Sequence, residues 1–255
     1  MNNFTYKKRN RIKALSAVMS DFSYKKHSHD EYAIGVTKRG IQHYYLDGSL
    51  QLSHQNGIMF FNPEQVHDGM AYGDSDLEYI MLYIEPSLLL EAIERKDYIR
   101  FSSPIIYNRS IQKNILYLFE AIFNEESEDI CDELFLKFAD SLTGYESNII
   151  QNQDQLIQRI KKEIISARKF EIETISNNIG MSKFQFIRYF NAQTGITPYQ
   201  FFLNAKVEGA RVILEQERDV HLAVNEFNFV DTSHLNRQFK KIYGITVNDY
   251  VNQIS

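Results

Sequence analysis

The sequence predicts an α+β protein of two domains: a front domain built as a β barrel with helices, and an all-α rear domain with two helix-turn-helix units. Three observations lead to this fold class. Short β-prone segments fill residues 32–84, helical spacing follows Pro86, and a string of about twenty residues in the rear half returns once. We expect the first domain to span residues 1–148 and the second 149–255.

The front segments are rich in Tyr, Phe, Ile and Val, and polar turns separate them. They read "YAIGV", "IQHYYL", "GIMFF" and "LEYIMLYI", with "KRG", "DGS", "HQNG" and "NPEQ" between or beside them. Such spacing is typical of an antiparallel sandwich or barrel.

Helical spacing begins after the barrel, in "SLLLEAIERK", "IQKNILYLFEAIFNE" and "ICDELFLKFADSL". Ile115, Leu118, Phe119 and Ile122 form an apolar stripe that we expect to cover the barrel. The polar segment "TGYESNIIQNQDQ", residues 143–155, is either the interdomain linker or the frayed start of the next helix.

Composition limits the class of protein. Of the 255 residues, 44% are hydrophobic and 24% charged, as in ordinary soluble globular proteins. No apolar run approaches the roughly 20 residues of a membrane span, and the basic start lacks the apolar core of a signal peptide. The single cysteine, Cys131, cannot form an internal disulfide, which favours a reducing compartment. We therefore expect a cytoplasmic protein without membrane partners.

The charge is divided unevenly between the halves. Residues 1–155 carry 15 Lys and Arg against 23 Asp and Glu, a net −8, whereas residues 156–255 carry 13 against 10, a net +3. A basic rear domain is consistent with nucleic-acid binding, although +3 alone is a weak indication.

The returning string supplies the stronger indication. "GMSKFQFIRYFNAQTGITPYQF" begins at Gly180, and "NFVDTSHLNRQFKKIYGITVNDY" begins at Asn228. At an offset of 49 the matched pairs are Arg188 with Arg237, Phe190 with Phe239, Gly195 with Gly244, Thr197 with Thr246, and Phe201 with Tyr250. Five matches at one offset predict two copies of one small unit.

Each copy has the pattern of two helices joined by a tight turn. Ile172, Ile175 and Ile179 give the first helix of copy one, Gly180 can adopt the positive φ of a C-cap, and Ser182 caps the second helix. Its inner face is Phe186, Tyr189 and Phe190. In copy two, Asn228 takes the place of the glycine, Asp231 is the cap, Leu235 and Phe239 face inward, and the turn is one residue longer.

The outer faces carry donors and exposed apolar groups that suit base edges in a major groove. They are Lys183, Phe184, Gln185, Ile187 and Arg188 in copy one, and Thr232, Ser233, His234, Asn236 and Arg237 in copy two. The alternative for a single such helix is a plain solvated face. Between the copies, "PYQFFLNAKVEGARVILEQE" predicts a helix of about 19 residues, roughly 28 Å long, which could hold two reading helices about one DNA turn apart.

Residues 156–250 resemble the double helix-turn-helix domain of the AraC/XylS transcriptional regulators, on "GMSKFQFIRYFNAQTGITP", "AKVEGARVIL" and "NFVDTSHLNRQFKKIYGIT". The resemblance implies that the outer-face residues enter two successive major grooves, and that Ser182, Lys240 and Lys241 contact phosphates. Asn228, Val247 and Val224 depart from the family pattern, where glycine, proline and a small residue are usual. These departures concern the packing of the second copy.

The front domain resembles the cupin-like sensor barrel of the same family, on "HSHDE", residues 27–31, and "GIMFFNPEQVHDG", residues 57–69. Enzymatic cupins bind a metal through two His, a Glu and a further His. His27, His29 and His67 are in place here, but Ala33 and Ile34 stand where that Glu would fall. If residues 27–31 form a strand, His27, His29 and Glu31 point inward together and could bind Zn or Fe. The alternative, which we prefer, is a metal-free pocket without cofactor, with His27, His29, Glu31, Tyr45 and His67 contacting a small-molecule effector.

These features predict a sequence-specific DNA-binding transcriptional regulator that responds to an effector and is not an enzyme. The alternative is a metal-dependent cupin enzyme with an accessory helical domain. The resemblance further implies a homodimer formed through a helix after the barrel, and it makes RNA polymerase a candidate partner beside double-stranded DNA.

Overall fold

The structure is a computed structural model that describes residues 2–73, 75–147 and 155–254. The chain divides into two compact units, one made mainly of residues 1–150 and the other mainly of residues 151–252. The expected domain boundary at 148/149 and most of the expected linker lie outside the described residues. Among the described residues, no helix combines the length and apolarity needed to cross a bilayer.

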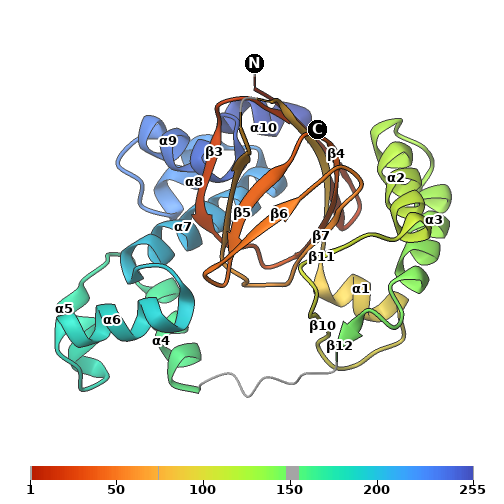
Figure 1. Ribbon diagram of the computed structural model, residues 1–255. Helices are drawn as coiled ribbons and strands as arrows, with labels where there is room; N and C mark the ends of the chain where they lie inside the picture. Colours follow the sequence, from red (N-terminus) through yellow and green to blue (C-terminus); the bar gives the residue numbers. More distant parts are fainter. Residues whose placement is uncertain (1, 74, 148–154, 255) are drawn as a thin grey trace. The chain divides into compact units, whose positions relative to one another are not determined.

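The first unit is a β barrel formed by two main sheets (Figure 1). The larger sheet has the order β1-β2-β9-β4-β7-β11 and the smaller one β3-β8-β5-β6. The strands are β1 (Asn3–Arg9), β2 (Ile12–Met19), β3 (Ser23–His27), β4 (Tyr32–Arg39), β5 (Gln42–Leu46), β6 (Ser49–Ser53), β7 (Ile58–Phe61), β8 (His67–Ala71), β9 (Leu77–Ile84) and β11 (Ile105–Ile106). A short pair, β10 (Arg100–Phe101) and β12 (Glu146–Ser147), stands apart from them. Because β3 is hydrogen-bonded to β8, we describe β3 with the barrel.

The barrel begins earlier than the sequence pattern indicates. The expected sheet region starts at Tyr32, but the hairpin of β1 and β2 precedes it, turning at Asn10 with φ of +51°. The run of Lys7, Lys8 and Arg9 at the end of β1 masks the alternation of the buried Phe4 and Tyr6. The expectation of a strand over residues 27–31 is wrong, because β3 ends at His27 and β4 begins only at Tyr32.

Three helices follow the barrel: α1 (Pro86–Ala92), α2 (Arg109–Phe123) and α3 (Glu128–Ser141). They pack as the sequence predicts. The α2 helix contacts α3 and also β1, β2, β4 and β9. All four residues of the expected apolar stripe, Ile115, Leu118, Phe119 and Ile122, are buried in one core with strand residues. The stripe of α2 therefore covers the barrel. Each aliphatic side chain of this kind contributes about 1.5–3 kcal/mol when buried.

The second unit is entirely helical. Its helices are α4 (Gln155–Ser166), α5 (Ile172–Asn178), α6 (Lys183–Thr194), α7 (Pro198–Glu217), α8 (Val220–Glu226), α9 (Thr232–Tyr243) and α10 (Val247–Gln253). The α7 helix contacts α4, α6, α8 and α9, so both helix pairs are built onto one central helix. It has 20 residues, close to the expected 19, and Pro198 lies in its first turn.

Candidate nucleic-acid interface and ligand site

The first helix-turn-helix unit consists of α5 and α6, and local hydrogen bonds fix its turn. Gly180 has φ of +70°, as expected for a residue that ends a helix. The Ser182 hydroxyl accepts from the Gln185 amide at 3.3 Å, and the Gln185 side chain accepts from the Ser182 amide at 3.0 Å. This capping box fixes the start of α6. Gln185, expected to read bases, thus also serves as part of the cap.

The inner face of α6 is the predicted one. Phe186 and Phe190 are fully buried, and Tyr189 is half-buried against the same core. Isoleucines of α4 and α5 complete that core. Because Phe186 and Phe190 are four residues apart on α6, the opposite face is left to solvent.

The outer face of α6 presents Phe184 and Arg188. Phe184 is 65% exposed, Arg188 is exposed, and Lys183 and Ile187 are half-buried. The Lys183 ammonium lies 3.0 Å from the Glu173 carboxylate of α5, and this hydrogen bond lowers the pKa of Glu173. The ion pair is solvent-exposed and therefore weak, so it does not prevent Lys183 from exchanging its partner for an anion.

The second helix-turn-helix unit consists of α8 and α9 and repeats this arrangement. The Asp231 side chain accepts from the His234 amide at 2.6 Å, as the predicted cap should. Asn228 has φ of +50°, so it replaces glycine in the left-handed conformation. Lys206 of α7 donates to the Asn228 carbonyl at 2.8 Å and lies 4.7 Å above the ring of Phe229. Lys206 therefore stabilises the longer turn between α8 and α9, a role that the sequence pattern did not reveal.

The predicted reading residues of α9 are not equivalent. Ser233 and Arg237 are exposed, whereas Thr232 and His234 are half-buried. Burial lowers the pKa of His234, and the cations Arg237 and Lys206 lower it further. His234 is thus neutral near pH 7, and it can exchange hydrogen bonds with a base edge without adding charge.

Asn236 has a structural contact. Its side-chain oxygen accepts from the Val247 amide at 2.8 Å, which joins α9 to the start of α10. A proline at position 247, as in the family pattern, could not donate this bond. Val247 thus supplies an amide donor for Asn236 where the family usually has proline. The first copy cannot form this hydrogen bond, because Pro198 stands at the equivalent position and has no amide hydrogen.

The predicted phosphate contacts lie at the surface. Ser182, Lys240 and Lys241 are exposed, and both lysines are in the last turn of α9. The ammonium of Lys241 donates to the Gln238 side chain at 3.0 Å. Long exposed lysines of this kind can follow a phosphate backbone without fixing a base.

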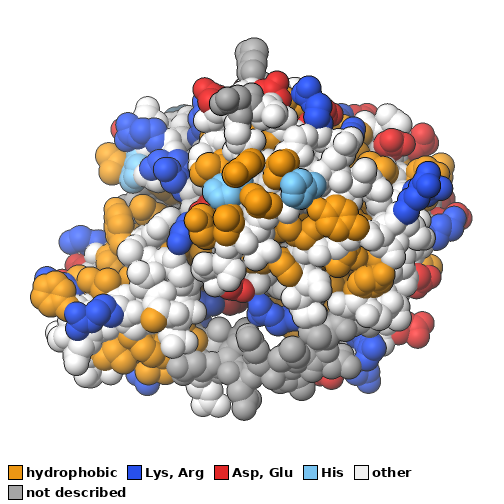
Figure 2. Space-filling model, viewed as in Figure 1, with side chains coloured by type: hydrophobic (Ala, Val, Ile, Leu, Met, Phe, Trp, Pro, Cys, Tyr) orange, Lys and Arg blue, Asp and Glu red, His pale blue; other side chains and the backbone are white. Residues whose placement is uncertain are grey.

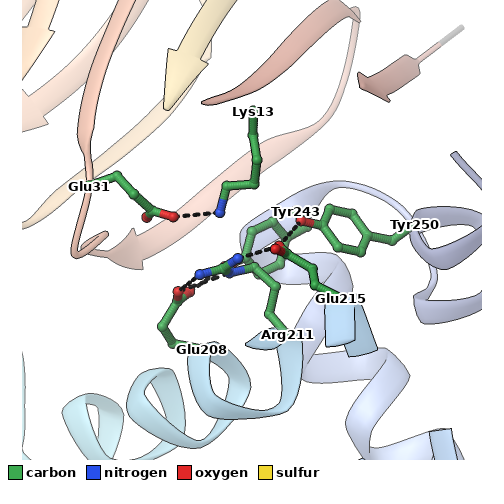
Figure 3. Close-up of polar contacts among 7 residues, drawn as sticks. All are labelled: Lys13, Glu31, Glu208, Arg211, Glu215, Tyr243 and Tyr250. Carbon is green, nitrogen blue, oxygen red and sulfur yellow. Dashed lines mark hydrogen bonds and ion pairs between the residues drawn. The ribbon is translucent and has the colours of Figure 1, made fainter. Parts of the chain in front are cut away.

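A buried polar network joins α7 to α9 and α10 (Figure 3). Arg211 pairs with Glu208 and Glu215, and its side chain is 8% exposed. The Tyr243 hydroxyl donates to Glu208, and the Tyr250 hydroxyl donates to Glu215 at 2.7 Å. Burial raises the pKa of both tyrosines, which keeps them as donors. The network thus connects α7 with α9 and α10.

The barrel brings together three of the predicted effector residues. His27, His29 and His67 are buried, and one ring nitrogen from each lies within 4.8 Å of the others. His27 ends β3, His29 lies in the turn that follows, and His67 begins β8. His27 and His67 therefore come from the neighbouring strands β3 and β8.

The other two predicted effector residues lie differently. Glu31 is buried and accepts from Lys13 at 2.6 Å (Figure 3), so its carboxylate is engaged with a cation and does not belong to the histidine cluster. Tyr45 is 41% exposed, whereas its neighbour Tyr44 is buried. Tyr45 thus points to the outer face of β5, where hydrophobic and histidine side chains gather over β5 and β6 (Figure 2).

Buried tyrosines supply polar groups inside the barrel that the sequence left unassigned. The Tyr79 hydroxyl donates to the Tyr24 hydroxyl at 2.9 Å, and both side chains are buried. Burial raises the pKa of each, so both stay protonated. Alternation along β9 could have indicated Tyr79, but Tyr24 lies in a strand with only one other buried residue.

Comparison with known proteins agrees with both halves. Residues 13–138 match the AraC-like ligand binding domain family, and residues 175–253 match a helix-turn-helix domain family. The HTH-type transcriptional regulator YbfI of Bacillus subtilis (strain 168) is 23% identical over 220 residues, which cover 82% of this chain and 80% of YbfI.

Solved structures show the same fold. ToxT from Vibrio cholerae O395 superposes with a TM-score of 0.60 at 12% identity, over 97% of this chain and 99% of ToxT. Wild-type ToxT of strain SCE256 with bound unsaturated fatty acid gives 0.59 at 13% identity, over 100% and 98%. A ligand-binding barrel followed by a double helix-turn-helix domain defines a transcriptional regulator. The chain belongs to the AraC/XylS family of such regulators.

Proposed function

We propose that this regulator binds a specific sequence of double-stranded DNA through α6 and α9, and that a small-molecule effector held by the barrel changes this binding. The observation that carries the proposal is the equivalence of the two helices. Each has 12 residues, a side-chain cap at its start, a left-handed glycine at its end and a buried apolar face that includes phenylalanine. Two such helices on one central helix suit two successive major grooves.

Base reading and phosphate contact are assigned to different residues. The predicted reading residues that are exposed are Phe184, Gln185 and Arg188 on α6, with Ser233 and Arg237 on α9. The half-buried Lys183, Ile187, Thr232, His234 and Asn236 remain proposed at the edges of these surfaces. Ser182, Lys240 and Lys241 would contact phosphates, which supply most of the affinity and its dependence on salt.

The effector proposal rests on His27, His29 and His67, which are gathered in the barrel, with Glu31 close in sequence. Tyr45 faces outward and would contact an effector only at the outer face of β5. The fatty acid in the ToxT structure supports a small molecule as the effector class. Since both matched families are those of a regulator, they favour this function over the cupin enzyme.

The same proposal includes a homodimer and RNA polymerase as partners in the cytoplasm. Tyr117, Ile130 and Leu136 on α2 and α3 are exposed apolar residues that a second copy would cover. Sedimentation of the purified chain at micromolar concentration as a monomer, with and without DNA, would contradict the dimer.

The test of DNA binding is a selection from random duplexes by the full-length chain at about 0.1 M salt, followed by titration of the enriched motif. Arg188→Ala should weaken binding to that motif by about 1–3 kcal/mol and relax the preference at one base. Lys240→Ala should instead weaken all duplexes equally and reduce the salt slope by about one. Lys137→Ala, which removes an exposed charge from α3, is the matched control. Absence of any enriched motif would refute sequence-specific binding.

A further inference from the structure

The short strand β6 lies at one edge of the smaller sheet. The sheet order β3-β8-β5-β6 places β5 on one side of β6, and in the described part of the chain β6 pairs with that strand alone. Its sequence, "SLQLS", contains neither a charged residue nor proline. Natural proteins commonly protect an open edge with such residues, because its unpaired backbone groups can pair with another chain. The edge at β6 has no protection of this kind.

The alternation of the ladder decides which backbone groups of β6 lie at this edge. The Tyr45 amide donates to the Asp68 side chain of β8 at 2.7 Å, so the backbone of Tyr45 faces β8 and not β6. Tyr45 lies opposite Leu50, and two residues away His43 lies opposite Leu52. Both are therefore non-hydrogen-bonded pairs of the antiparallel ladder. The N–H and C=O groups of Leu50 and Leu52 consequently point away from β5, toward the open edge.

The side chains of Leu50 and Leu52 share the outer face of the smaller sheet with other apolar groups. Leu50 is 48% exposed and lies opposite Tyr45, which is 41% exposed. Met70 of β8 lies opposite His43 and is 37% exposed. Hydrophobic and histidine side chains accordingly gather over β5 and β6 (Figure 2). An exposed apolar patch of this kind is typical of a contact with another protein.

The sequence of β6 reads the same in both directions about Gln51. Two antiparallel copies related by a two-fold axis at Gln51 would place Leu50 of each copy opposite Leu52 of the other, and Ser49 opposite Ser53. Such a contact is isologous, because the same surface serves both copies. The leucine pairs would exchange backbone hydrogen bonds, since their N–H and C=O groups already point to the edge. A second copy of the chain therefore matches this edge in backbone, side chains and symmetry.

We propose that two copies of the chain pair through β6, antiparallel and centred on Gln51, so that their smaller sheets join into one. The inference goes beyond the proposed function, whose contact between copies lies on α2 and α3. The two contacts use different surfaces, and a chain that makes both forms assemblies larger than a dimer. An edge of five residues is small beside the roughly 800 Å² per partner of stable interfaces, so the pair forms and dissociates with protein concentration.

The test is disulfide cross-linking of the full-length chain under mild oxidation. In the proposed register, the two copies of residue 51 form a non-hydrogen-bonded pair with Cα atoms about 4.5 Å apart, a distance that a disulfide spans. Gln51→Cys should therefore give a cross-linked dimer. Leu50→Cys is the matched control and should not cross-link, because its own counterpart lies diagonally across the pair, about 7–8 Å away. The original chain should not cross-link either, because its single cysteine, Cys131, is buried.

A charge exchange tests the same register without oxidation. Both double variants carry Leu136→Lys, which places a charge on the exposed apolar face of α3 and removes the other contact between copies. Leu50→Lys with Leu52→Lys sets like charges opposite each other and should sediment as a monomer. Leu50→Lys with Leu52→Glu sets opposite charges across the axis and should retain the concentration-dependent dimer.

Three results would overturn the proposal. They are the absence of a cross-linked dimer of Gln51→Cys, equal cross-linking of Gln51→Cys and Leu50→Cys, and equal sedimentation of the two charge variants. The substituted leucines lie at the surface, so melting temperatures close to that of the original chain confirm that each variant is folded.

Discussion

Replacing Arg211 by methionine should destabilise the second unit strongly. Arg211 is 8% exposed and lies between Glu208 and Glu215, whose side chains are 16% and 6% exposed. Methionine fills a similar volume without charge, so packing on α7 is largely kept. The two carboxylates lose their shared cation, while Tyr243 and Tyr250 still donate to them.

The expected loss follows from the removal of the arginine that pairs with both buried carboxylates. Removing one partner of a buried ion pair typically costs about 3–5 kcal/mol. Glu208 retains some contact with water, so we expect a loss of about 3 kcal/mol. Neutralising the carboxylates as well, in Arg211→Met with Glu208→Gln and Glu215→Gln, should restore at least half of it, because Gln still accepts from the tyrosines.

The assay is hydrogen exchange of peptides from α7, α9 and α10 in increasing urea. This measurement isolates the second unit, whereas a global signal from a chain with two units would mix two transitions. Arg188→Met, at an exposed position of α6, is the control and should change stability by less than about 0.5 kcal/mol. The reasoning is refuted if Arg211→Met costs less than about 1 kcal/mol, or if the triple variant is less stable than the single one.

Three further predictions concern the second helix-turn-helix unit. Gly209→Ala should lower the melting temperature, although alanine favours helices by about 1 kcal/mol, because the new Cβ would lie 2.2 Å from the Phe227 ring. In a Phe227→Ala background the same change should raise the melting temperature, and equal effects in both backgrounds would contradict the clash. Asn236→Ala and Val247→Pro each remove one side of a hydrogen bond and should lower the free energy of unfolding by about 1 kcal/mol. The double variant should be no less stable than the less stable single variant. Additive losses in urea unfolding would show that the bond contributes nothing. Burial, with Arg237 and Lys206, lowers the pKa of His234, so the unfolded chain binds more protons and stability should fall as pH drops from about 7.5 toward 5. In thermal melts, the melting temperature of His234→Gln should depend less on pH, and an unchanged pH dependence would exclude His234 as the cause.

The sequence predicted best what depends on neighbours in the chain. Ser182, Asp231, Gly195 and Gly244 begin and end α6 and α9 as expected, because caps are formed within three or four residues. The offset of 49 holds for both ends of α6 and α9. Periodicity also identified the buried faces, since residues four apart on a helix share one side.

The strands were harder to predict. The charged end of β1, Lys7 to Arg9, hid the alternation of its buried residues, and the turn between β3 and β4 ended the expected strand at His27. The outward position of Tyr45 could not be derived, because a shift of one residue reverses every side chain of a strand.

By itself, the sequence determined the two classes of domain, the capped helices α6 and α9, and the set of histidines that belong to the barrel. The tertiary structure alone decided that His27, His29 and His67 converge, that Glu31 pairs with Lys13, and that Asn236 bonds to residue 247. The physical reason is the range of the interactions. Caps and helix periodicity are set by adjacent residues, whereas the contacts of His67 with the other two histidines, of Lys13 with Glu31 and of Asn236 with Val247 join residues that are distant in the sequence. Only the packing of strands and helices brings them within reach.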